Sequence, residues 1–507
     1  MSNNELNQIE EIIEKKENND EKNYKSILIN AIESTTIHGL PMIIKENNYL
    51  AKIIWLVLFL SASSLCLFLN RKSVIDFMNY EVITKVRIIN EPKLEFPTIT
   101  ICNKNRFSTD LAVDFMRKVI KENNLDDIFD QEKFINNKSL RFVDKRRKVR
   151  LVQDTARLLL ENMNDQYRKS LSISIENMLI ECRFGGKECT KFDFDLFYIT
   201  QHGVCFRFNS DQDNQRKAKE LYKTGWRNGF RLDLYVGLPN YLNKIALEKG
   251  VFLYIHTTRD FQPKEIHINP GEETSIALKK SIYEQMPYPY SNCSSHESIV
   301  DPYVLNLISY LNYSYSQEIC IEMCYLINIK RICNCTQNWN NFKFPDQNVS
   351  LCLSKKEQEC DSNFYNKQFI SDDYISKNCN CPLECKKVIY DTFITNAKYP
   401  TKFYTDSLRN DQMFMKRFAN TTHEFDDLDQ DLIRINVYFD SLSYLEISES
   451  ESVSLIALIS DIGGTLGLFL GMSLLSITES IEIIIKLVYM ILKHKFKKHI
   501  QVSSNRE

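Results

Sequence analysis

Two long apolar stretches divide the chain. One runs from Tyr49 to Leu69 and the other from Val453 to Tyr489. A helix needs about 20 apolar residues to cross a bilayer, so each stretch is long enough. Between them, residues 70–451 alternate short polar and apolar patterns typical of a folded region. The pattern therefore predicts a membrane protein with two spans and one large region outside the membrane.

The second apolar stretch is polar for a membrane span. Charged groups at membrane depth are costly and usually face a protein interior or water. Asp461 and Glu479 are 18 residues apart, five turns of 3.6, so an unbroken helix would place both on one face. One helix cannot enclose water, so the polar face indicates a bundle of several chains. The polar residues are Asp461, Thr465, Ser473, Ser476, Glu479 and Glu482.

A plain membrane anchor is the alternative for this stretch. Gly463, Gly467 and Gly471 recur every fourth residue, a pattern that lets two helices approach closely and dimerise. Two carboxylates on one face have no role in such an anchor, which favours a water-filled path.

Flanking charges orient the chain. Lys486, Lys493, Lys495, Lys497 and Lys498 follow the second span, and such clusters mark the cytoplasmic side. We therefore expect cytoplasmic segments at 1–48 and 491–507, spans at 49–69 and 452–490, and an extracellular region at 70–451. Residues 1–34 are polar and charged, as in poorly ordered segments, and show no cleaved signal peptide.

Cysteines and sequons also place the central region outside the cell. The net charge is −2, which gives no sign of nucleic-acid binding. Of 15 cysteines, Cys66 lies in the first span and the others lie between Cys102 and Cys385, as expected in an oxidising compartment. Candidate glycosylation sites are Asn137, Asn292, Asn312, Asn334, Asn348 and Asn420.

Short patterns predict a mixed α/β extracellular region. Strands joined by turns are expected in the segments HGVCFRFNS, GFRLDLYV (229–236) and GVFLYIHTTRDFQP, in FPTITICNKNRFS, and at 433–444. An amphipathic helix follows Ser108 or Thr109 as its N-cap. The basic run Lys145–Arg150 fits a solvated helix face better than a protease site.

The sequence contains few motifs that would indicate a catalytic or metal site. The chain has no nucleophile elbow, phosphate loop or zinc-protease motif, so we expect no enzyme. Cys333/Cys335 and Cys379/Cys381 are close pairs, but no tetrahedral ligand set accompanies them. His256 is interpreted as a structural histidine. We expect no bound cofactor or metal.

A family resemblance gives these patterns a function. The segment DIGGTLGLFLGMSLLSITE (461–479) closely resembles the second transmembrane helix of the degenerin, epithelial sodium channel and acid-sensing channel family. FPTITICN and the three strand segments resemble its blocks in order, and the resemblance runs from about residue 36 to 486. It implies a trimeric α+β channel with a palm β-sheet and a helical finger and thumb. FPTITICN would be a palm strand, and residues 433–444 would be the last palm strand, in the same sheet.

The resemblance also assigns roles in the pore. Gly471, Met472 and Ser473 would break the helix and form the selectivity filter, although Met472 is bulkier than usual. Asp461 would form an outer carboxylate ring, and Glu479 and Glu482 inner rings, that concentrate cations. The permeant ion would be Na⁺, with Ca²⁺ as a second possibility. Gating roles would fall to His38 and Gly39, to Ser460, and to an aromatic contact of Tyr80 with Tyr290.

The extracellular cysteines follow the family's spacing. Carried over, it implies a stiff thumb held by nested bridges. The implied disulfides are Cys102–Cys205, Cys182–Cys189, Cys293–Cys385, Cys320–Cys381, Cys324–Cys379, Cys333–Cys360 and Cys335–Cys352.

The activating stimulus is the least determined feature. Acid-sensing members carry a histidine pair after the first span, where this chain has Glu81 and Val82, so proton gating is disfavoured. Peptide-gated members of simple animals match better. The leading hypothesis is therefore an amiloride-sensitive sodium channel subunit of the plasma membrane, in a homo- or heterotrimer, opened by an RFamide-type neuropeptide. Alternatives are proton, constitutive, protease-activated or mechanical gating, and a non-conducting disulfide-rich receptor.

Overall fold

The structure is a computed structural model that forms two compact units. One unit comprises Met1–Ile83 with Ser450–Glu507, and the other comprises Thr84–Glu449. The described residues are 37–122, 142–161, 163–199, 202–210, 218–257, 264–293, 300–311, 313–337, 349–352, 354–425, 427–476 and the positions 478, 479, 481, 482, 484, 485, 488, 489 and 492.

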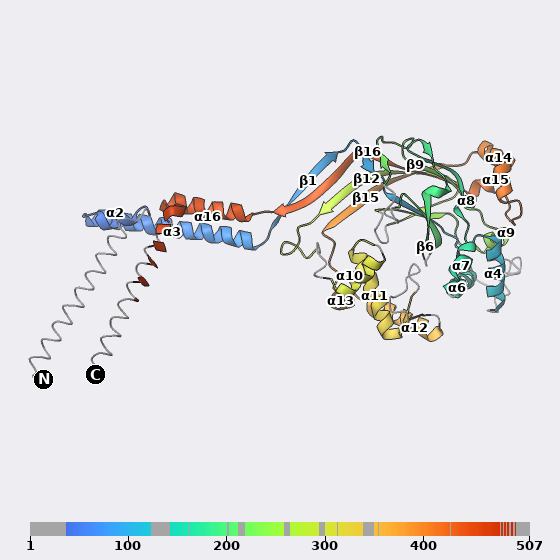
Figure 1. The fold of residues 1–507 in the computed structure, drawn as a ribbon, viewed down its shortest axis with the longest axis horizontal. Coiled ribbons are helices and arrows are strands. Elements are labelled where there is room, and N and C mark those ends of the chain that lie inside the picture. The colour runs from blue at the N-terminus through green and yellow to red at the C-terminus, as the bar shows by residue number, and fades with distance from the viewer. Residues whose placement is uncertain are drawn as a thin grey trace, which may run out of the picture. The chain divides into compact units, whose positions relative to one another are not determined.

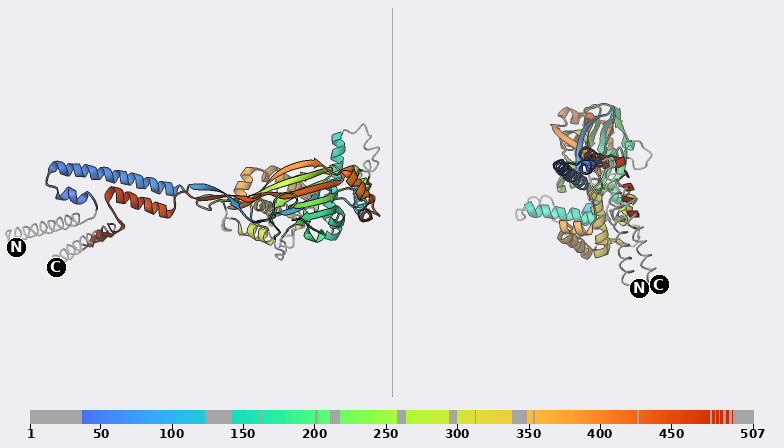
Figure 2. Two further views of the ribbon diagram at one scale, coloured as in Figure 1. Left: turned by 90° about the horizontal axis from the view of Figure 1, so that it is seen from above. Right: turned by 90° about the vertical axis from the view of Figure 1, so that its left-hand side faces the viewer.

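The first unit is helical. After the short helix α2 (Leu40–Lys45), α3 spans Tyr49–Met78 and begins at Asn48, whose side chain accepts a hydrogen bond from Leu50 N. The predicted span ended at Leu69, but the helix continues for two more turns. α16 (Leu455–Leu470) lies beside α3 (Figures 1 and 2). In the described part of the chain, only α3 is long and apolar enough to cross a membrane by itself.

A seven-stranded sheet is the centre of the second unit (Figure 1). The long strand β16 (Leu432–Glu451) pairs in parallel with β12 and antiparallel with β9, and β1 pairs with it off this path. The first half of β16 is buried and its second half is half-exposed. The strand order is β15 (Lys386–Lys398), β12 (Glu272–Glu284), β16, β9 (Phe230–Tyr235), β4 (Leu179–Phe184) and β5 (Lys187–Glu188), with β1 at Val82–Asn90.

A second sheet has five strands, and it corrects one expectation. The FPTITICN strand, β3 (Thr98–Asn103), was expected in the same sheet as β16. It instead pairs with β10 and β7, with Cys102 opposite Cys205. All six of its residues are buried, because other strands flank both its edges and apolar side chains cover its faces. The order is β11 (Glu265–Ile268), β10 (Val251–His256), β3, β7 (Gly203–Phe208) and β6 (Phe194–Ile199).

The core between these strands includes one buried ion pair. Asp233 on β9 lies opposite Arg434 on β16 and is completely buried. Two hydrogen bonds join them, Arg434 Nε to Oδ1 (2.7 Å) and Nη2 to Oδ2 (2.6 Å). The Tyr399 hydroxyl donates a third bond to Oδ2 (3.1 Å). This network ties the two strands together by charge-assisted hydrogen bonds.

Helices gather at two places around the sheets. α4 (Asp110–Glu122), α6 (Phe142–Glu161) and α9 (Asn240–Ile245) share one apolar cluster. Thr109 is the N-cap of α4, since its hydroxyl accepts a bond from Ala112 N (3.3 Å). The basic run 145–150 lies on α6. The shorter elements are α7 (Asp165–Ser170), α8 (Ile175–Met178), α14 (Lys402–Asn410), α15 (Gln412–Arg417), η2 (Lys191–Asp193), η4 (Leu428–Gln430), β2 (Leu94–Glu95) and β8 (Glu220–Leu221).

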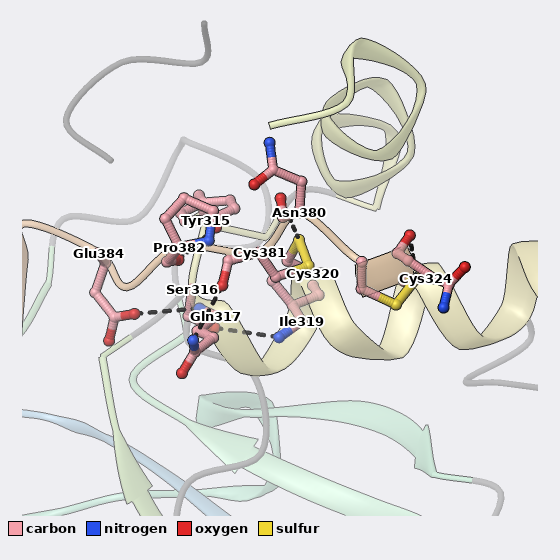
Figure 3. The surroundings of a disulfide bond; sticks show 12 residues. Tyr315, Ser316, Gln317, Ile319, Cys320, Cys324, Asn380, Cys381, Pro382 and Glu384 are labelled. Carbon is pink, nitrogen blue, oxygen red and sulfur yellow. Dashed lines mark hydrogen bonds between the residues drawn. A yellow bond between two sulfur atoms is a disulfide. The ribbon is translucent and has the colours of Figure 1, made fainter. Parts of the chain in front are cut away.

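The second helical group is held by disulfides. It comprises α10 (Pro302–Tyr310), α11 (Gln317–Cys333), α12 (Lys355–Phe364), η3 (Tyr365–Phe369), α13 (Asp372–Asn378), β13 (Cys335–Thr336) and β14 (Ser350–Leu351). Figure 3 shows Cys320 of α11 near its bridge to Cys381, where Gln317 N donates to Glu384 Oε2 (3.1 Å). The structure contains the seven cysteine pairs that the family's spacing implied, and Cys66 is a free thiol.

Candidate pore site

Helix α16 presents a carboxylate away from its packing partner. Its side facing α3 is the half-buried stripe that includes Leu458 and Ile462. Asp461 and Ser460 are exposed, and the Asp461 carboxylate has no ion-pair or hydrogen-bond partner among the described residues. An unpaired carboxylate on an apolar helix is stable only beside water or another polar group. In this unit the face with Asp461 is therefore available to solvent or to another copy of the chain.

The glycines of α16 do not mediate its contact with α3. A Cβ added at Gly463 would meet no atom within 4 Å. At Gly467 the nearest atom would be the backbone oxygen of Met472, at 3.8 Å. The close-packing face expected from the four-residue spacing is therefore unused between these two helices.

The helix ends where the family resemblance expected a break. α16 stops at Leu470, and Gly471 has a left-handed backbone with φ +64°. Gly471 N donates to Gly467 O (3.0 Å) and Met472 N donates to Leu466 O (3.2 Å), which satisfies the last carbonyls of the helix. Met472 and Ser473 are not helical. The turn at Gly471 interrupts the helix, so Asp461 and Glu479 do not lie on one face of an unbroken helix.

The residues after the break begin a new helical segment. Ser473 Oγ accepts a hydrogen bond from Ser476 N (3.2 Å), and Ser476 Oγ accepts one from Ser473 N (3.1 Å). This reciprocal pair is the arrangement of an N-terminal cap. Glu479 and Glu482 lie in the helical positions described beyond it, and both are exposed.

The His-Gly pair contacts this break directly. His38 N donates a hydrogen bond to Leu470 O (2.9 Å). The His38 ring fills the space beside Gly471, where an added Cβ would lie 2.0 Å from Nδ1. Gly39 has φ +94°, and its Cα side faces Phe59 of α3. Two motifs from opposite ends of the chain therefore meet, which sequence spacing could not predict.

A polar contact joins α3 to α16. The Thr465 hydroxyl and the Asn70 side-chain oxygen form a hydrogen bond. Asn70 Nδ2 also lies 3.4 Å from the sulfur of the buried Cys66. Asn70 was not among the predicted site residues, although a polar residue directly after an apolar stretch is a signal for such a role.

Outside the pore, several expected sites have a definite environment. His256 is buried between Thr100 Oγ1 (2.9 Å) and Thr257 O (2.6 Å), as a structural histidine is. No cluster of metal-ligating side chains occurs among the described residues. Burial raises the pKa of Glu322 on α11 to about 7.

Two further expectations were the glycosylation sites on the surface and one aromatic contact between the two units. Asn292, Asn334 and Asn420 are exposed, while Asn137, Asn312 and Asn348 lie outside the described residues. The contact of Tyr80 with Tyr290 would join the two units and stays a prediction.

These features define a class. An apolar membrane helix, a second apolar helix that carries an exposed carboxylate and ends at a left-handed glycine, and a disulfide-rich α/β region together describe an ion channel with a large folded region outside the pore. Residues 31–483 match the family model described as amiloride-sensitive sodium channel. The match covers most of the chain, and the chain belongs to this family. Its members are ion channels rather than enzymes.

Individual relatives are about one quarter identical to the chain. An FMRFamide-activated amiloride-sensitive sodium channel of Cornu aspersum is 25% identical, over 89% of this chain and 81% of its own length. A bile acid-sensitive ion channel of Mus musculus is 25% identical, over 89% and 85%. The epithelial sodium channel subunit beta-2 of Xenopus laevis is 25% identical, over 91% and 83%.

One solved structure also matches weakly. A proton-activated chloride channel studied by cryo-EM aligns with a TM-score of 0.31 and 6% identity, over 86% of this chain and 98% of that chain. A score this low says nothing further about the fold.

Proposed function

We propose that this chain is a subunit of a trimeric plasma-membrane sodium channel, with α3 and the segment 452–490 as its two spans and both termini in the cytoplasm. The observation that carries the proposal is the end of α16 at Gly471, which follows an exposed and unpaired Asp461 on the same helix. Irregular backbone and an unpaired carboxylate are tolerated at membrane depth where they line water. Three copies would enclose such a path.

In this proposal each polar element of the broken helix has one task. Asp461 forms an outer ring of three carboxylates that raises the local cation concentration. The backbone carbonyls of Gly471 and Met472, with the Ser473 hydroxyl, replace hydration water at the narrowest point. Glu479 and Glu482 form the inner rings. Sodium is the main permeant ion.

The contact of His38 with Gly471 suggests how the filter is supported. The His38 backbone N–H satisfies the Leu470 carbonyl, and its ring occupies the position that a side chain at residue 471 would need. Displacing His38 would free the turn to rearrange. His38 and Gly39 are accordingly proposed as residues that hold the filter in shape, and Ser460 as a residue that sets resting activity.

The proposed stimulus is an extracellular RFamide-type peptide. Its support is the similarity to an FMRFamide-activated channel and the absence of histidine at positions 81 and 82. The strand β16 ends at Glu451 and α16 begins at Leu455, so a displacement of the extracellular sheet has a short covalent route to the pore.

Patch-clamp recording of the expressed chain tests the pore first. Ser473→Cys and Asp461→Cys channels should lose current when a charged thiol reagent is applied from outside, whereas Cys66, buried on α3, should leave wild-type channels insensitive. Asp461→Asn should reduce single-channel sodium conductance without abolishing opening. A chain that conducts under no stimulus, alone or with related subunits, would instead be a non-conducting receptor.

The stimulus is tested separately on the same cells. RFamide peptides and then acid are applied to wild-type channels. Current evoked by peptide supports the proposal, and current evoked only by acid would replace it with proton gating. Glu322 is the group that favours this second candidate, because its pKa of about 7 lets it titrate near neutral pH.

A further inference from the structure

A cavity in the extracellular unit has the charge and shape of a ligand site. It is lined by residues of α4, α6, α9 and the turn that follows β3. Figure 1 shows that these three helices gather at one corner of the second unit. Its volume is about 400 Å³, within the range of small-molecule sites. One wall is apolar and consists of Phe107, Met116, Leu238, Leu242 and Ile245.

The charged part of the lining is mainly basic. Lys104, Arg106, Arg150 and Arg157 line the cavity together with two carboxylates, Asp154 and Glu248. Four cationic groups minus two anionic groups leave an excess of two positive charges. His202 also lines it. Burial, and then the charge of Arg106, lower the pKa of His202 to about 4, so this ring is neutral and adds no charge.

Two of the cations have buried groups at the cavity. The Lys104 side chain is only 7% exposed, and its Nζ lies 5.6 Å from the Phe252 ring centroid. Glu248 is its nearest counter-ion at 3.9 Å, a long contact to an exposed carboxylate. Arg157 Nε is buried and has no hydrogen-bond partner in the described part of the chain. A buried donor without a partner is costly unless a ligand or water satisfies it.

We propose that this cavity binds a small amphiphilic carboxylate, with its apolar part against Phe107, Met116 and Leu242 and its carboxylate against Arg157 and Arg106. Arginine recognises carboxylates by paired, charge-assisted hydrogen bonds, which a neutral or cationic ligand cannot form. The excess positive charge disfavours the basic peptide proposed above as the channel's stimulus. The cavity is therefore a second ligand site that stands independently of that proposal.

Two sources could supply this chemistry, an acyl carboxylate and the free C-terminus of an apolar peptide. Binding to the purified full-length chain in detergent is measured by calorimetry and by thermal shift, with N-octanoylglycine for the first source and the peptide Phe-Leu-Phe for the second. The amide form of each probe is its matched neutral control. At least one carboxylate should bind saturably, with its amide at least about tenfold weaker.

Variants locate the site. Arg157→Gln and Arg106→Gln should each weaken the carboxylate probe by about tenfold or more, whereas Arg227→Gln, an exposed arginine outside the cavity, should bind as the wild type does. Arg157→Lys keeps the charge and serves as the folding control. Whichever probe binds more tightly identifies the source.

Three results would overturn the proposal. These are an amide that binds as tightly as its acid, binding that Arg157→Gln and Arg106→Gln leave unchanged, and no saturable binding of either carboxylate at millimolar concentration. The readout is binding and not current. Failure here therefore leaves the pore proposal intact, and a chain without current can still pass this test.

Discussion

Replacing Gly471 by alanine tests the link between the His-Gly pair and the helix break. Gly471 has φ +64°, where an L-residue costs roughly 1–2 kcal/mol. Its new Cβ would lie 2.0 Å from His38 Nδ1, so His38 must move and its hydrogen bond to Leu470 O, worth about 0.5–1.5 kcal/mol, is lost. The turn is therefore destabilised by about 1.5–3.5 kcal/mol in total. A change of about 1.4 kcal/mol corresponds to a tenfold change in population.

The expected result is a loss of current. Because the proposed filter is built from this turn, Gly471→Ala should reduce whole-cell sodium current more than tenfold at equal surface expression, which is measured by surface biotinylation. Gly463→Ala is the matched control on the same helix. A Cβ there meets no atom within 4 Å, so current should remain near wild type.

A double variant separates the two contributions. His38→Ala keeps the backbone N–H that binds Leu470 O but removes the ring. Combined with Gly471→Ala, it relieves the collision and leaves only the backbone strain, so current should recover in part. Wild-type current from Gly471→Ala alone would refute the reasoning, since neither the left-handed turn nor the contact with His38 would then matter.

Two further predictions concern the extracellular unit. Asp233→Asn removes the bidentate counter-ion of the half-buried Arg434 and leaves only the long contact to Glu273 (4.0 Å), so the free energy of unfolding should fall by up to about 3 kcal/mol. The loss should appear as a lower melting temperature and poor surface expression. The exposed Asp440→Asn should cost less than about 1 kcal/mol. Glu322 has a folded pKa of about 7 against 4.5 for a free side chain, so its protonated form favours folding and the free energy of unfolding should fall as pH rises from about 4.5 to about 7. Glu322→Gln should remove this pH dependence, whose total size is up to about 3 kcal/mol in the free energy of unfolding. Glu318→Gln, at an exposed position on the same helix, should keep it. An unchanged melting temperature in Asp233→Asn, or an unchanged slope in Glu322→Gln, would contradict these assignments.

Local patterns in the sequence were sufficient to predict many of the helices and strands. The apolar stretch beginning at Tyr49, the amphipathic helix after Thr109 and the strands β7, β9 and β10 follow from periodicity and caps, because each depends on neighbours within a few residues. Seven disulfides came from the family's spacing and not from periodicity, since fourteen cysteines allow far too many pairings.

Tertiary structure decided the features that depend on residues far apart in the chain, such as sheet membership and the pairing of side chains across strands. β3 reads as a strand from its sequence, but only the positions of β7 and β10 assign it to the five-stranded sheet. Asp233 and Arg434 are ordinary polar residues until the register of β9 and β16 places them opposite each other.

The pore contact illustrates the same division. The family resemblance in the sequence marked His38 and Gly39, and separately Gly471 to Ser473, as two motifs. Only the folded chain brings the His38 ring against Gly471, because the space beside a left-handed glycine is fixed by the path of both segments. Local propensity determines which residues form helices, strands and turns, whereas contacts between distant segments depend on packing, which no local pattern encodes.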